Sequence, residues 1–117
     1  MIELTVLNYL KSALNVPVYM EKPTGTIEEY VVIEKTSSSR ENYINTAMFA
    51  IQSYSDTMYN AALLNEEVKN AMIGDGVDEL GITAATNISK CSLNSDYNFT
   101  DQQTKSYRYQ AVFDLVF

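Results

Sequence analysis

Hydrophobic and polar positions alternate along this chain with two different periods, which predicts a mixture of helices and strands. The chain opens with a helical pattern that ends at Asn15, because Pro17 pushes the residue before it out of the α region. The predicted apolar face of this first helix consists of Val6, Leu7, Leu10, Ala13 and Leu14.

A second helix is predicted in the middle of the chain. The stretch from Tyr43 to Tyr54 reads as a long strand, and Ser55-Asp56 then offers an N-cap. Gly74 can adopt the left-handed conformation that ends a helix. The face predicted to be apolar consists of Ala61, Leu64, Val68, Ala71 and Met72, with Asn60, Glu66, Glu67 and Asn70 opposite.

Strands are expected on both sides of this unit. Val18-Tyr19-Met20 predicts a short edge strand, because Pro17 cannot donate to a ladder. The apolar centre of Glu29 to Lys35 indicates a strand covered on both faces. Ile82 to Leu93 is a weaker strand candidate, whereas Thr104 to Phe117 alternates strongly and predicts a half-buried strand.

Two polar segments between the strands are predicted to be loops, Thr36 to Asn42 and Asn94 to Gln103. Each has few residues able to pack, so we expect both to be mobile until an axial neighbour orders them. Their exposed side chains are candidates for protein contacts, and we single out Arg40, Glu41, Asp96 and Tyr97.

The predicted order is helix, three strands, helix and two strands. Strands joined by tight loops favour antiparallel pairing, with the helices packed together on one side. The sequence therefore predicts an α+β fold, with a mostly antiparallel sheet in one layer and two helices on one face of it.

Composition narrows the possible functions. The 117 residues fit one domain, 1–117, and their net charge of −7 disfavours general binding to nucleic acid or anionic membranes. A single cysteine, Cys91, favours a reducing compartment. The chain lacks an N-terminal signal pattern and an apolar run of about 18 residues, so we expect a soluble protein of the cytoplasm.

Candidate catalytic and metal-binding patterns are weak. The absence of histidine removes Ser-His, Cys-His and His-metal sites, and leaves Cys91 without an activating imidazole. The acidic stretch from Asp96 to Asp101 begins with the spacing of a calcium loop but lacks the glycine at its sixth position. We expect no enzymatic activity, no cofactor and no metal site.

Surface composition instead favours protein contacts. The nine tyrosines suit interfaces, because the ring is apolar while its hydroxyl stays satisfied. Tyr59 and Leu63 lie four residues apart on the second helix, away from its predicted core face. Both alternating sets of the strand from Tyr43 to Tyr54 are substantially apolar, which indicates contact with another element or subunit.

The chain as a whole resembles the small tail-terminator proteins of long-tailed bacteriophages, also called tail-completion or tail-to-head joining proteins. Trp, often found near the strand-to-helix junction in that family, is absent here, and Tyr54 occupies this area. The segments that carry the resemblance are the first helix leading into Pro17-Val18-Tyr19, the strand Tyr30-Val31-Val32-Ile33, the run Phe49-Ala50-Ile51-Gln52-Ser53-Tyr54-Ser55 entering a helix with Ala61-Ala62-Leu63-Leu64, and the final Tyr107-Arg108-Tyr109.

The resemblance implies a structural virion protein that caps the tail tube and joins tail to head. Its implied partners are further copies of itself in a ring, usually a hexamer, the tail tube protein, and a head-completion or connector protein. Its implied location is the tail-head junction of the virion, with the host cytoplasm as the site of assembly. Two alternatives stay open: another connector, stopper or neck protein of the same particle, and a small cytosolic ligand-binding or enzymatic α+β domain.

Overall fold

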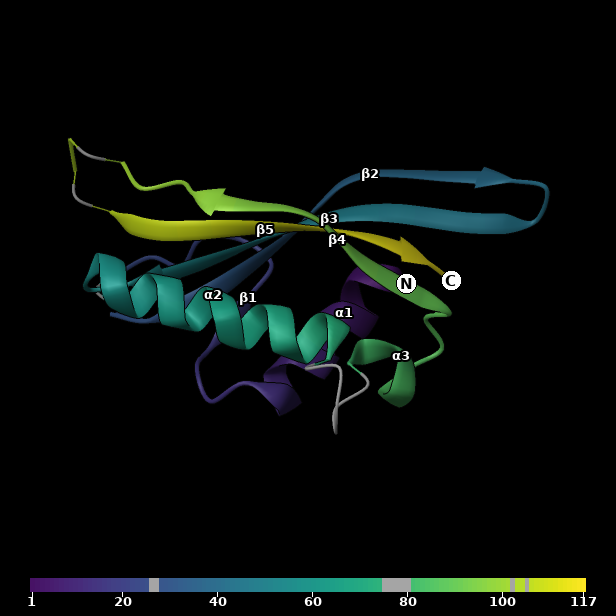
Figure 1. Cartoon of the computed structure of the whole chain (residues 1–117), viewed down its shortest axis with the longest axis horizontal. Coiled ribbons are helices and arrows are strands. Elements are labelled where there is room, and N and C mark those ends of the chain that lie inside the picture. The colour runs from purple at the N-terminus through teal and green to yellow at the C-terminus, as the bar shows by residue number, and fades with distance from the viewer. Residues whose placement is uncertain (26–27, 75–80, 102, 105) are drawn as a thin grey trace.

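The computed structural model describes residues 1–25, 28–74, 81–101, 103–104 and 106–117 (Figure 1). The elements in chain order are α1 (Ile2–Ala13), β1 (Val18–Tyr19), β2 (Tyr30–Glu41), β3 (Ile44–Ser55), α2 (Met58–Ile73), α3 (Ile82–Ala85), β4 (Lys90–Asn98) and β5 (Tyr107–Val116).

The described strands form one sheet in the order β1-β2-β3-β5-β4. β1 pairs with β2 in parallel, and every other neighbouring pair is antiparallel. Figure 1 shows α1, α2 and α3 on the same side of the sheet. The predicted α+β class, the mostly antiparallel sheet and the edge position of the first strand are therefore confirmed. The short helix α3 was not predicted.

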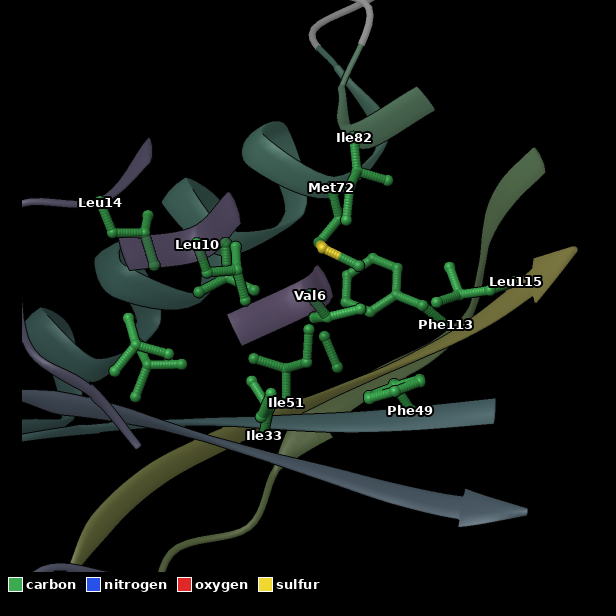
Figure 2. Packing of buried hydrophobic residues seen from close by; sticks show 14 of the residues in the cluster. Val6, Leu10, Leu14, Ile33, Phe49, Ile51, Met72, Ile82, Phe113 and Leu115 are labelled. Atoms are coloured by element: carbon green, nitrogen blue, oxygen red, sulfur yellow. The ribbon is translucent and has the colours of Figure 1, made fainter. Parts of the chain in front are cut away.

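The main hydrophobic core lies between the helices and the sheet (Figure 2). Phe49 on β3 and Phe113 on β5 are opposite each other in the ladder, and both are fully buried. Leu10 on α1 and Met72 on α2 belong to the same buried cluster. The predicted face of α1 is correct except at Ala13, which is exposed at the end of the helix.

The apolar face of α2 is confirmed, although its N-cap differs from the prediction. Thr57 is the N-cap, and its hydroxyl accepts a hydrogen bond from the Asn60 amide at 3.1 Å. Ser55, by contrast, is the last residue of β3. Gly74 ends the helix as predicted, with φ of 80° and its amide bonded to the carbonyl of Asn70.

The start of β2 is buried on both faces, as its continuous apolar run predicted. Val31 and Ile33 face the helices and belong to the main core. Tyr30 and Val32 point to the other face and form a second small cluster with Tyr54. The rings of Tyr30 and Tyr54 are stacked with their centroids 4.6 Å apart.

The prediction of a loop from Thr36 to Asn42 was wrong. β2 continues through Glu41 and pairs with β3 as far as Ile44, so only Asn42 and Tyr43 form the turn. Both turn residues have positive φ, 52° and 67°, as a type I′ hairpin turn requires. Pairing with β3 satisfies the backbone groups of this polar segment that point toward β3, which the sequence pattern alone did not reveal.

The predicted boundaries in the last third of the chain also change. The segment predicted as one strand, Ile82 to Leu93, contains α3 and only the beginning of β4. The predicted loop from Asn94 to Gln103 is wrong over its first half, because β4 runs through Asn98. Residue 102 of this range lies outside the described residues, as does residue 105 of the final predicted strand. β5 itself confirms that strand.

Candidate interaction surfaces

A shallow groove lies between α2 and the sheet at the end where α2 begins. Tyr59 and Leu63 stand on its helix side and are 72% and 46% exposed, so they are surface residues as predicted. The groove has a volume of about 270 Å³. We call it the α2–β4 groove, and its lining residues are Tyr59, Ala62, Leu63, Asn65, Glu66, Asp96 and Tyr109.

Asp96 ties β4 to α2 beneath this groove. Its Oδ2 accepts hydrogen bonds from Asn65 Nδ2 at 3.1 Å and from Lys69 Nζ at 2.9 Å. Lys69 also pairs with Glu66 Oε1 at 2.7 Å. Its hydrogen bond to Glu66 and, to a smaller extent, its hydrogen bond to Asp96 raise the pKa of its ammonium group. Asp96 therefore has a packing role in the fold as well as a place in the groove.

Asn65 lies at the floor of the groove. The residue is 1% exposed, and its Oδ1 has no hydrogen-bond partner among the described residues. A buried acceptor without a donor costs free energy, because it has lost its hydrogen bonds to water. Because this oxygen is itself buried, it lies beneath the groove and is not presented at its surface.

Tyr97 lies on the opposite face of the sheet from this groove. It pairs with Gln110 across the β4–β5 ladder, and its hydroxyl accepts a hydrogen bond from Gln110 Nε2. Its ring meets Phe99 edge to face at 5.8 Å, and the Arg108 guanidinium lies over Phe99 at 4.3 Å. Tyr97 therefore belongs to an aromatic row on the helix-free face.

Arg40 and Glu41 occupy a third place, near the tip of the β2–β3 hairpin. The hairpin extends past the helix layer and reaches one end of the molecule (Figure 1). We call residues 36–46 the arm. The hydroxyls of Ser39 and Thr46 bond across it at 2.7 Å, and its cross-strand register is continuous from Ser37 to Ile44.

The six predicted interface residues therefore separate into three surfaces. Tyr59, Leu63 and Asp96 come together in the α2–β4 groove, whereas Tyr97 lies behind the sheet. The prediction missed the two most prominent apolar residues of the arm, Tyr43 and Ile44. An Asn followed by one residue between two strand-forming segments is a hairpin pattern that could have indicated them.

Two of the candidate chemistries can be checked in the structure, a metal site and a reactive thiol. Among the described residues, no group of three or more His, Cys, Asp or Glu side chains is placed to hold a metal ion. Burial, followed by the nearby Asp114 carboxylate, raises the pKa of the Cys91 thiol to about 12. Since the thiolate is the nucleophile, Cys91 is unreactive near neutral pH.

No protein-family model matches the sequence, and no curated protein matches it either. None of the helices that the structure describes has the length and apolar character needed to cross a membrane. Function is therefore inferred from the residue patterns and the surfaces described above.

Proposed function

We propose that this protein is a tail terminator of a long-tailed bacteriophage, which forms a ring on the end of the tail tube. One observation carries the proposal: two unlike surfaces lie at opposite ends of the molecule. The α2–β4 groove with Tyr59 and Leu63 lies at one end, and the arm lies at the other (Figure 1). The residue patterns shared with tail terminators support the same assignment.

Two unlike surfaces are what a cyclic ring needs. A ring with more than two subunits uses a heterologous contact, in which one patch of each subunit meets a different patch of the next. Surfaces on opposite ends of an elongated subunit, 45 Å along its longest axis, can meet in this way around a closed rotation. On the tail, such a ring would be a hexamer, as is usual in the tail-terminator family that this chain resembles.

The proposed ring has two axial partners. The tail tube protein would bind one side, and a head-completion or connector protein would bind the other, at the tail-head junction of the virion. A net charge of −7 suits a ring through which DNA passes, because a lumen that repels phosphates does not retain the genome. Ring assembly would occur in the host cytoplasm.

The helix surface provides the direct test. Tyr59→Ala combined with Leu63→Asp should leave the fold intact by circular dichroism but abolish incorporation into tails, releasing tubes of uncontrolled length. Leu4→Asp on α1 is the matched control, because Leu4 and Leu63 are equally exposed, at 46%. The control should cap tails normally.

Each of three outcomes would contradict one part of this proposal. Normal capping by the double variant would remove this helix surface from the interface. Loss of the fold in that variant would show that the two side chains support the core. If the wild-type protein binds the portal but not the ends of polymerised tubes, it is a connector or another neck protein.

Binding to DNA is a separate check. We expect no measurable binding to duplex DNA at physiological salt, because phosphate contacts need clustered Lys and Arg. A gel-shift or anisotropy titration near micromolar protein measures this. A shift that weakens as salt rises would contradict the proposed passive lumen.

A further inference from the structure

Tyr43 at the tip of the arm has a conformation that its side chain disfavours. Its φ of 67° lies in the left-handed region, which bulky residues seldom occupy because Cβ approaches the carbonyl oxygen. The side chain is also 90% exposed, so no packing within the subunit offsets this strain. Glycine is the residue that best suits the second position of such a turn after asparagine.

An exposed tyrosine where glycine would fit better indicates a contact outside the subunit. Strained backbone positions cluster at active sites and ligand-binding segments, and tyrosine is among the residues that dominate interface energetics. Ile44 follows at the tip and is 53% exposed. Together the two side chains give the arm an apolar end on an otherwise polar hairpin.

The α2–β4 groove has the properties required to receive that end. A cavity of about 150 Å³ holds a benzene ring, so a groove of about 270 Å³ has room for a tyrosyl side chain. Its walls include the exposed apolar side chains of Tyr59 and Leu63. Its lining offers the partly exposed Asp96 carboxylate as an acceptor for the tyrosyl hydroxyl.

The arm cannot reach the groove of its own subunit. Figure 1 shows the tip of the arm at one end of the long axis and the first turn of α2 toward the other. The charges also suit a contact between copies. Glu66 and Asp96 share Lys69, which leaves the groove with an excess negative charge, and Arg40 lies three residues before Tyr43 on the arm.

We infer that the arm of one subunit docks into the α2–β4 groove of a second copy, with Tyr43 as the anchor residue. The inference rests on the proposed ring and names its two contacting surfaces. Tyr43 and Ile44 enter against Tyr59 and Leu63, and Arg40 approaches Glu66. Every subunit gives its arm to one neighbour and receives the arm of the other.

Cross-linking between two different variants tests this contact directly. In a Cys91→Ala background, Glu41→Cys beside the anchor and Ala62→Cys in the groove lining are mixed at high concentration and treated with a short bismaleimide. Both changes leave Tyr43, Tyr59 and Leu63 in place. The yield of mixed dimer should be at least about 10-fold higher than in a control where Lys11→Cys, on the exposed side of α1, replaces Ala62→Cys. A chain that carries both cysteines should form closed oligomers.

Tyr43→Gly supplies the complementary measurement in the tail-capping assay. It removes the anchor while giving the turn its preferred residue, so the folded arm should persist by circular dichroism while capping falls at least about 10-fold. Tyr43→Phe retains the ring and should retain most of the capping. The difference between these two variants isolates the aromatic contact from the conformation of the turn.

The outcomes separate this inference from the proposed function. A mixed dimer no more abundant than the Lys11→Cys control overturns the docking contact, and so does normal capping by Tyr43→Gly. Loss of capping by Tyr43→Gly without the mixed dimer would mean that the arm binds a different protein, which also overturns it. Specific cross-linking by a protein that never binds tube ends would support the contact and contradict the terminator assignment.

Discussion

The two halves of β2 differ more than any other neighbouring segments of this molecule. The first four residues, Tyr30 to Ile33, are buried, whereas the last eight are exposed. Both halves are paired with β3. The first half is held by a core on either face, and the second by its partner strand and a tight turn. Strand structure in this protein therefore does not require burial, provided that the backbone is paired.

The largest expected difference between the two halves is in stability. Phe49→Ala in the covered part of β3 should lower the free energy of unfolding by about 3–5 kcal/mol, because it leaves a cavity in the core. Thr46→Ala in the arm removes only an exposed hydroxyl pair with Ser39 and should cost no more than about 1 kcal/mol. Urea unfolding of both variants measures this. Equal losses would show that the arm is part of the cooperative core.

Thiol reactivity should show the same contrast. Cys91 has a pKa raised to about 12, so it stays protonated at pH 8. A cysteine introduced by Ser39→Cys in the exposed arm has no such burial, so it should react with iodoacetamide at least about 100-fold faster. Mass spectrometry after timed labelling distinguishes the sites. Comparable rates would contradict the protected environment of Cys91.

The raised pKa also fixes the sign of a pH effect. Below about pH 8, the thiol of Cys91 is protonated in both states and contributes no pH dependence. As the pH rises toward 12, the unfolded thiol ionises while the folded one keeps its proton, so the free energy of unfolding falls. A comparison of Cys91→Ala with the wild type across this range isolates that contribution from the tyrosines.

Backbone opening should differ less strongly between the two halves. The arm amides that point toward β3 are paired with it, so we expect measurable protection for them instead of the fast exchange that a loop would give. They should still exchange at least about 10-fold faster than the amides of Ile33 and Ile51, which lie in the core. Native-state hydrogen exchange measures this. Equal protection would contradict a locally opening arm.

Tyr43→Gly should produce the smallest change in stability. Relief of the left-handed tyrosine favours the folded state, while the added backbone freedom of glycine favours the unfolded one. We expect the free energy of unfolding to rise by no more than about 1 kcal/mol, because relief of the left-handed conformation is the larger of the two effects. Denaturant unfolding measures it beside the capping assay. A loss of stability would show that Tyr43 stabilises its own subunit.

The sequence by itself determined the helices and strands whose formation depends on residues close together in the chain. The apolar spacing of α2 fixed its buried face, and Gly74 fixed its end. The alternation of Tyr107 to Phe117 fixed a half-buried strand, and the order of elements fixed the fold class. Helical spacing, caps and alternation act within a few residues, so one chain segment contains all the information they need.

Within the α2–β4 groove, the sequence indicated Tyr59 and Leu63, because both lie away from the buried face of a helix that the sequence predicts. It did not indicate that Asp96 would join them. Strict alternation from Leu93 places Asp96 on the opposite face of β4, but a register shift between Leu93 and Ser95 turns its carboxylate toward α2. A bulge of this kind depends on the partner strand, so it leaves little trace in the sequence.

Tertiary structure alone decided that the polar segments are strands. Residues 36–41 lack the apolar alternation that marks a strand, and their conformation comes from hydrogen bonds to β3 across a two-residue turn. The second half of β4, from Asn94 to Asn98, gains its place in the same way from β5. Hydrogen bonds between backbone groups hold these segments in place. Because nearly every residue type carries the same backbone groups, the pattern of side chains does not reveal this pairing.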